Sequence, residues 1–496
     1  MRRLLVWVAV GILALYLLLL IPLPEPPAPQ GAARKQFVWN QDARWIALEQ
    51  QYAQERHRGC GDLAAAIDSS LASGAASLAH ISSGQFQSED SAFGQVEGAV
   101  FDLGPMVAVC YARLSEYLRF AARVRTVVKE QSFHWDMNSI TARRRMYRLL
   151  YGGRAAVEEV LLQSPGEVVP SLTLGDDEPS QTPSTKVLGV TIHSGDILAS
   201  RGGAPTSALI ARGNDYPGNF SHVALVHVDD KTNLASIIES HIERGVAVAT
   251  LGDYLKDVKL RVMVLRLRAD LPLLRANPLL PHIVALWALQ TARARHIPYD
   301  FTMDFHDSTK MFCSEVVSNP YRHYGINLWM GLSSISAPGV VSWLSAFGVQ
   351  HFETQEPSDL EYDPQLKVVA EWHDPETLFR DHVDNAVIDA LLEGAENGEK
   401  LEYDWYFLPV GRLLKGYSIL LNSFGKEGPV PEGMSAEAAL RNLWFSSHHK
   451  AIKERTLRYA AEFKVREGYG PPYWQLLNLA RRAKNELYPD SHESDR

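Results

Sequence analysis

The chain has 496 residues, of which 46% are hydrophobic and 22% charged, values typical of a folded globular protein rather than a disordered one. This length exceeds one ordinary domain, so we expect two or three folded units. The net charge of -9 is spread along the chain without a basic tail or stripe. The usual signature of nucleic-acid binding is therefore missing, and no nucleic-acid partner is predicted.

The N-terminal segment "MRRLLVWVAVGILALYLLLLIPLPEPPAPQ" has two arginines followed by an unbroken apolar run over residues 4–21. Eighteen helical residues span about 27 Å, close to the hydrocarbon thickness of a bilayer, which predicts a transmembrane helix within residues 1–24. The Pro-rich spacer at 25–40 offers no clear A-x-A site, which favours an uncleaved signal anchor over a cleaved signal peptide. The positive-inside rule then predicts a single-pass inner-membrane protein with most of the chain extracytoplasmic.

Three cysteines occur in the sequence, at Cys60, Cys110 and Cys313. In an oxidising compartment Cys60 and Cys110 are the candidates for a disulfide because they lie in the same segment, but the sequence does not decide whether they are joined. Cys313 is left over. Such a residue is either an inert buried side chain or a reactive thiol.

Hydrophobic periodicity changes along the chain. Apolar residues at helical spacing predict an α-helical domain over 41–163, and a Pro-, Ser- and Asp-rich stretch at 164–186 is typical of a linker. Short β-branched runs within 187–352 predict an antiparallel sheet. Helical spacing returns over 353–496, where Asp374 followed by a proline is typical of a helix start.

The strand-like run "SHVALVHV" places a histidine at its head. Alternation puts His222, Ala224 and Val226 on one face, with Val223 and Leu225 on the other. A lone histidine at a strand start is usually structural, so this run alone does not identify a catalytic residue.

The segment "MFCSEVVSNPYRHYG" adds a candidate nucleophile. Thr309 or Ser308 can cap a helix with Cys313 in its first turn, where unpaired N–H groups and the helix dipole favour a thiolate. The same N–H groups could hold the oxyanion of a tetrahedral intermediate. A buried helical cysteine is more often only a small hydrophobe, so the combination of motifs carries the prediction.

These motifs, in this order, resemble the circularly permuted NlpC/P60 cysteine hydrolases, and in particular the YiiX/YaeF/YebB-like permuted papain-like amidases. "SGDILAS" is similar to the opening strand of that family, "FSHVALV" to its histidine strand, and "YDF" with "FCSEVV" to its tyrosine and nucleophile segments. The resemblance covers residues 189–352, about a third of the chain. It implies an α+β fold in which a permuted papain-like domain with an antiparallel sheet is flanked by helical regions.

The resemblance also implies the roles of four residues. Cys313 would be the nucleophile, His222 the general base and acid, and Glu239 the group that orients the imidazole. Tyr299, in "PYD", would lie near the site and donate to the oxyanion.

The sequence "IIESHIERG" leaves two candidates for the partner of His222. Glu239 and His241 fall on one face of a strand, and either could reach a neighbouring imidazole. We favour Glu239, because a carboxylate stabilises the imidazolium formed when Cys313 loses its proton.

No metal or other cofactor is predicted, because the remaining histidines lack a metal-binding spacing such as H-E-x-x-H. The histidines considered are His227, His241, His306, His448 and His449.

Together these features predict a membrane-anchored, extracytoplasmic cysteine hydrolase, an amidase, peptidase or acyl-ester hydrolase that works through a Cys-His-Glu triad and an acyl-enzyme. The expected substrate carries an apolar or lipid-like acyl group. The alternatives are an endopeptidase for peptidoglycan stem peptides and a non-catalytic scaffold or binding protein. The sequence predicts contact with the membrane through the N-terminal helix and names no protein partner.

Overall fold

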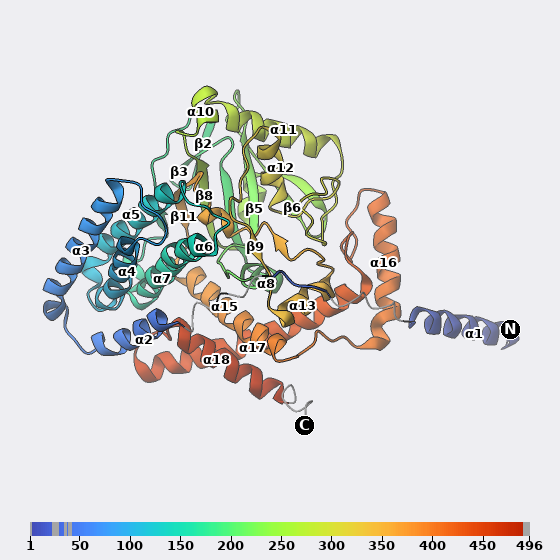
Figure 1. The fold of residues 1–496 in the computed structure, drawn as a ribbon. Helices are drawn as coiled ribbons and strands as arrows, with labels where there is room; N and C mark the ends of the chain where they lie inside the picture. The colour runs from blue at the N-terminus through green and yellow to red at the C-terminus, as the bar shows by residue number, and fades with distance from the viewer. Residues whose placement is uncertain (1, 22–28, 34–36, 38–41, 490–496) are drawn as a thin grey trace.

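The computed structural model describes residues 2–21, 29–33, 37 and 42–489. A seven-stranded antiparallel sheet lies at the centre, with one group of helices from the N-terminal part of the chain and another from the C-terminal part (Figure 1). The predicted α+β fold with helical flanks is confirmed. Most of the predicted spacer at 25–40 lies outside the described residues.

The N-terminal helices pack through the periodic apolar residues of the sequence. Trp45, Leu48 and Tyr52 are buried on one side of the first of them. Asp42 caps this helix by accepting a hydrogen bond from the backbone N–H of Trp45 at 3.0 Å, which satisfies one of the free donors at a helix start. The helices are α2 (Ala43–Glu55), α3 (Cys60–Ser82), α4 (Ser91–Val109), α5 (Leu114–Ser132), α6 (Ile140–Tyr147) and α7 (Gly153–Gln163), with one π-helical turn, Arg148–Gly152.

The central sheet has the strand order β1-β11-β8-β4-β5-β6-β7, and every neighbouring pair is antiparallel. Its strands are β1 (Leu172–Leu174), β4 (Ile197–Gly202), β5 (His222–Val228), β6 (Ala235–His241), β7 (Gly245–Thr250), β8 (Lys259–Leu267) and β11 (Leu366–Trp372). Two small ribbons pair β2 (Ser184–Val187) with β3 (Val190–His193), and β9 (Ser333–Ser334) with β10 (Glu353–Thr354).

The alternation predicted for β5 is present in the core. Val223 and Leu225 belong to the apolar cluster that includes residues of helices α11 (Leu280–Ala294) and α12 (Glu315–His323). Ala224 and Val226 belong to a separate cluster on the opposite face. Both faces of the strand are therefore buried, and His222 at its first residue keeps partial access to solvent.

The sheet uses residues outside the range 187–352. Strand β1 comes from the segment whose composition is typical of a linker, and β11 comes from the segment with helical spacing. Strand β1 has three residues, too few to show a period, and β11 has consecutive apolar residues at a bulge between Val368 and Ala370, which interrupts the alternation. Shorter helices complete this part: α8 (Pro205–Arg212), α9 (Leu251–Lys256), α10 (Pro272–Ala276), α13 (Pro338–Phe347) and α14 (Asp359–Tyr362).

Four helices form most of the C-terminal part: α15 (Pro375–Glu396), α16 (Leu408–Ser423), α17 (Ala436–Glu467) and α18 (Tyr473–Leu487). The predicted start of α15 is confirmed, because the Asp374 side chain accepts hydrogen bonds from the backbone of Glu376 and Thr377 in a capping box. Its face of buried residues contacts α18, α17 and the sheet.

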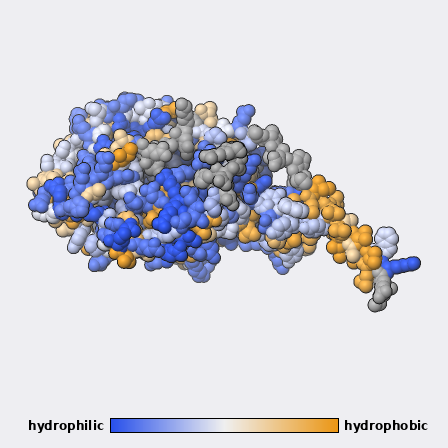
Figure 2. Space-filling view, turned by 90° about the horizontal axis from the view of Figure 1, so that it is seen from below, coloured by the Kyte–Doolittle hydropathy of each residue, from blue (hydrophilic) through white to orange (hydrophobic). Residues whose placement is uncertain are grey.

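The prediction of a transmembrane helix, and with it a single-pass inner-membrane location, is wrong. Among the described residues, none of the helices combines the length and apolarity needed to cross a bilayer. The apolar run does not form one helix to residue 21, since α1 is Arg2–Leu19. Its apolar part, 4–19, is about 24 Å long, shorter than the roughly 30 Å hydrocarbon core. Helix α1 projects beside α16 and displays exposed apolar side chains (Figures 1 and 2).

Cys60 and Cys110 are joined in a disulfide, which settles the pairing that the sequence left open. Cys60 is the first residue of α3, and Cys110 follows the last residue of α4. The bond closes a loop between positions 50 residues apart and fixes two packed helices to each other.

We expect the double variant Cys60→Ser/Cys110→Ser to lose about 2–4 kcal/mol of unfolding free energy, because the unfolded chain regains the entropy of the open loop. Urea unfolding followed by circular dichroism measures this change. Wild-type protein kept in a reductant is the matched control and should unfold like the variant. An unchanged unfolding midpoint would contradict a stabilising role.

Candidate active site

The four residues singled out in the sequence line one cavity of about 610 Å³. They come from β5, from β6 and from the segment before α12. His222 and Glu239 lie on neighbouring strands, whereas Tyr299 and Cys313 reach the same cavity from the segment between α11 and α12, further along the chain.

Antiparallel pairing places the imidazole and the carboxylate together. Ala224 pairs with Glu239, so His222, two residues before Ala224 on the same face, lies diagonally opposite the carboxylate. The Nε2 atom of His222 is 2.9 Å from Oε2 of Glu239. Because a carboxylate only accepts, Nε2 carries the hydrogen and Nδ1 is left as the basic nitrogen of the neutral ring.

Glu239 has a second histidine partner. Nε2 of His241 lies 3.1 Å from its other carboxylate oxygen, and the rings of His241 and His222 are 5.7 Å apart. Burial alone would raise the pKa of Glu239, but the hydrogen bonds from both histidines outweigh burial and hold this pKa well below the usual range. The carboxylate therefore stays ionised, and His241 supports it from the side opposite His222.

Cys313 precedes its helix instead of lying within the first turn. Helix α12 begins at Glu315 with Ser314 at the N-cap, so the expected cap at Thr309 or Ser308 is wrong. Cys313 and Ser314 form a turn, and the helix begins directly after that turn. The thiol is buried, and its sulfur lies 3.9 Å from the backbone carbonyl oxygen of Ser221, the residue before His222.

Burial raises the pKa of the Cys313 thiol to about 12, and the nearby carboxyl of Glu356 acts in the same direction. Cys313 is therefore a neutral thiol at rest, not the thiolate that a position in a first helical turn would favour. Glu356 is itself buried, and burial together with Asp359 raises its pKa. Sequence reasoning missed Glu356, because nothing in "ETQEPSD" distinguishes this residue from the other two acids of the segment.

Tyr299 also borders the cavity beside Cys313. Burial raises the pKa of its hydroxyl well above the usual range, and Cys313 and Glu356 add to this effect. The Tyr299 hydroxyl therefore remains protonated and can donate a hydrogen bond.

Within the part of the chain that the structure describes, no three His, Cys, Asp or Glu side chains are grouped so as to hold a metal ion. The chemistry available in this cavity is that of a thiol, an imidazole, a carboxylate and a phenol.

Comparison with known proteins supports the resemblance seen in the sequence. Residues 191–370 match the permuted papain-like amidase family, described as YaeF/YiiX, C92. A solved structure, the metalloprotein YiiX from Escherichia coli O157:H7, is 20% identical, with a TM-score of 0.29 and coverage of 36% of this chain and 97% of that chain. No curated protein matches the chain.

The family match begins on β3, ends on β11 and includes every strand of the central sheet except β1. All four candidate site residues lie inside it. Residues 191–370, about a third of the chain, are thus similar to the permuted papain-like amidases.

Proposed function

We propose that the protein hydrolyses an amide or ester bond through Cys313, His222 and Glu239. The observation that carries this proposal is the hydrogen bond between His222 and a buried, ionised Glu239 in the same cavity as the Cys313 thiol. An oriented base beside a nucleophile is the arrangement that thiol acyl transfer needs.

In the proposed reaction, Nδ1 of His222 takes the Cys313 proton as the sulfur attacks the substrate carbonyl carbon. The resulting imidazolium is stabilised by Glu239 and gives its proton to the departing amine or alcohol. Water then attacks the thioester, loses a proton to His222, and releases the acid and the free thiol. His222 finally returns the proton taken from water to the sulfur of Cys313. The reaction therefore consumes the substrate and one water molecule and needs no other reactant.

The tetrahedral oxygen would be held at the start of α12. Backbone N–H groups there point away from the helix and favour negative charge. The protonated Tyr299 hydroxyl is a second donor on the cavity wall.

The cavity walls support an acyl group with apolar character. Ile210, Ile242 and Val258 line it, together with Ala204. Lys259 and Glu243 also border it and could meet the polar end of a substrate. We therefore propose an apolar or lipid-like acyl substrate, and hydrolysis of a cell-wall peptide is the competing outcome.

A panel of p-nitrophenyl esters from acetate to octanoate, beside short peptide anilides, tests the reaction and its substrate. We expect kcat/KM to rise with acyl length, because each buried CH₂ contributes about 0.8 kcal/mol. Cys313→Ala should abolish turnover. Faster cleavage of the anilides would favour the peptide substrate, and no turnover of either class would favour a binding protein.

Alkylation by iodoacetamide should report the protonation state of Cys313. The other two cysteines, Cys60 and Cys110, are joined in the disulfide and do not react. With a pKa of about 12, only about one thiol in 10⁵ is ionised at pH 7, so the rate should rise about tenfold per pH unit from pH 7 to 10. Protein unfolded in urea is the control and should level off near the ordinary thiol pKa. A plateau below pH 7 would instead indicate a preformed thiolate–imidazolium pair.

Glu239→Gln keeps the shape of the side chain but removes the charge that stabilises the imidazolium. We expect kcat to fall about 100-fold or more, while the unfolding midpoint changes little. His241→Ala is the matched control on the same strand and should cost less than about tenfold, since it touches Glu239 but not the thiol. If His241→Ala alone abolished turnover in folded protein, the third role would belong to His241.

A further inference from the structure

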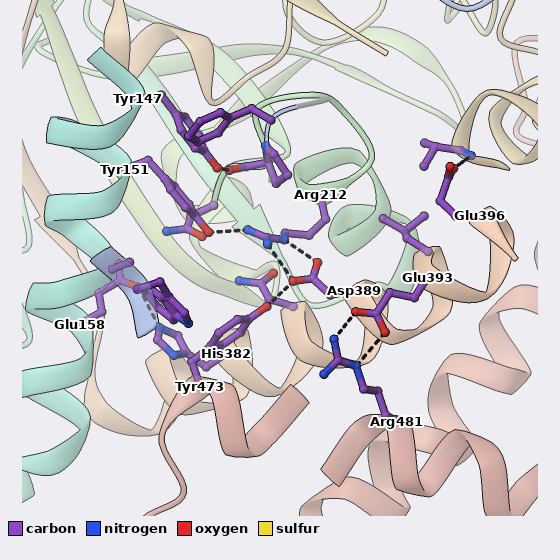
Figure 3. A pocket seen from close by; sticks show the side chains of 18 of the residues that line it. Tyr147, Tyr151, Glu158, Arg212, His382, Asp389, Glu393, Glu396, Tyr473 and Arg481 are labelled. Atoms are coloured by element: carbon purple, nitrogen blue, oxygen red, sulfur yellow. Dashed lines mark hydrogen bonds and ion pairs between the residues drawn. The ribbon is translucent and has the colours of Figure 1, made fainter. Parts of the chain in front are cut away.

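A second cavity of about 430 Å³ lies where the N-terminal helices, α8 and the C-terminal helices meet (Figure 3). It shares no lining residue with the cavity of Cys313. Tyr147, Tyr151 and Tyr473 contribute aromatic walls, and one stripe of α15 contributes a row of polar side chains, which are His382, Asn385, Asp389, Glu393 and Glu396.

The charged groups in the middle of this cavity are already paired. Arg212 donates to both oxygens of Asp389, at 2.9 and 2.8 Å, and to the hydroxyl of Tyr151 at 2.6 Å. The hydroxyl of Tyr473 also bonds to Asp389 (Figure 3). Arg212 therefore has no spare charge for a ligand, which argues against an anion in this position.

His382 and Asn385 are buried, at 6% and 3% exposure, and each has an atom to which the described residues supply no hydrogen-bond partner. Nε2 of His382 is 2.9 Å from Glu158, a carboxylate whose charge is already matched by Arg261 and Arg154. Because a carboxylate only accepts, Nε2 carries the hydrogen in this contact, and the other ring nitrogen, Nδ1, is the atom available as an acceptor. The unpartnered atom of Asn385 is its carbonyl oxygen, which is also an acceptor.

These two acceptors occupy adjacent positions on the cavity wall. His382 and Asn385 are three residues apart on α15, and Asp389 follows four residues later, so their side chains share one face of the helix. A buried acceptor without a donor is unfavourable, and a ligand with suitable donors would remove that cost.

Carboxyl groups outnumber cations around the cavity. Five acids line it beside only two arginines: Glu158, Glu159, Asp389, Glu393 and Glu396 against Arg212 and Arg481. Glu393 is paired with Arg481 at 2.7 Å. Glu396 accepts a hydrogen bond from the backbone of Val340, and within the described residues it has no arginine or lysine partner.

We infer that this cavity binds a small organic amine, whose ammonium N–H groups donate to Asn385 Oδ1 and His382 Nδ1 while its carbon chain packs against the tyrosine rings. Aromatic faces favour a cation, and so does Glu396, a lining carboxylate to which the described residues bring no arginine or lysine. The volume is in the range of pockets that enclose a small molecule.

Isothermal titration calorimetry of the full chain with 1,4-diaminobutane and 1,4-butanediol tests this inference. The two probes have the same carbon chain and differ in charge and donor number. We expect the diamine to bind at least about tenfold more tightly than the diol, which corresponds to about 1.4 kcal/mol of binding free energy. Equal binding of the diol, or no binding of the diamine, would overturn the proposal.

Asn385→Leu should weaken diamine binding by about tenfold or more, while the thermal midpoint stays the same or rises because an unpartnered acceptor is removed. A second variant, Glu396→Gln, alters an exposed side chain and should weaken binding by about fivefold. Glu376→Gln removes one charge from the exposed start of the same helix and is the matched control. Wild-type affinity in folded Asn385→Leu and Glu396→Gln would contradict the assignment.

Discussion

The buried ion pair between Glu158 and Arg261 connects all three parts of the molecule. Glu158 lies on α7, and Arg261 lies on β8 near the middle of the sheet, with side chains 5% and 0% exposed. Arg261 also contacts Asp381 on α15 at 2.6 Å. Burying such charges is costly unless each is paired, so loss of one member would leave the others uncompensated. The helical regions are therefore held to the sheet by groups that depend on one another.

This network has consequences for both cavities. Glu158 also holds Nε2 of His382 and so determines which ring nitrogen is left without a hydrogen-bond partner among the described residues. On the other side, β8 pairs with β4, and β4 pairs with β5, the strand that begins at His222. The strand that carries His222 and the polar stripe on α15 therefore both depend for their positions on the same buried charges.

Helix α8 links the two cavities directly. Its Arg212 binds Asp389 in the second cavity, whereas Ser207, five residues earlier, lines the first. The hydroxyl of Ser207 is hydrogen-bonded to that of Ser221, whose carbonyl faces the Cys313 thiol. A continuous set of contacts therefore joins the proposed amine site to the proposed nucleophile through one short helix.

Local rules predicted the parts of the site that depend on neighbours in the sequence or on one strand pair. Alternation along "SHVALVHV" gave the correct faces of β5, and the position of Glu239 in "IIES" placed it within reach of His222. The same rules failed for the ends of helices and for contacts between residues that are distant in the sequence. The apolar N-terminal run ends as a helix at Leu19, and Cys313 lies before its helix. The distant Glu356 left no pattern at all.

By itself the sequence determined the α+β class with helical flanks, the resemblance of the central segment to a known family and the candidate thiol, imidazole and carboxylate, because periodicity and motif order are properties of the chain. Only the tertiary structure decided that Glu239 serves two histidines, that Cys313 is a buried neutral thiol, and that a second polar cavity exists. The physical reason is that pKa values and unsatisfied hydrogen bonds depend on burial and on groups brought together from distant segments.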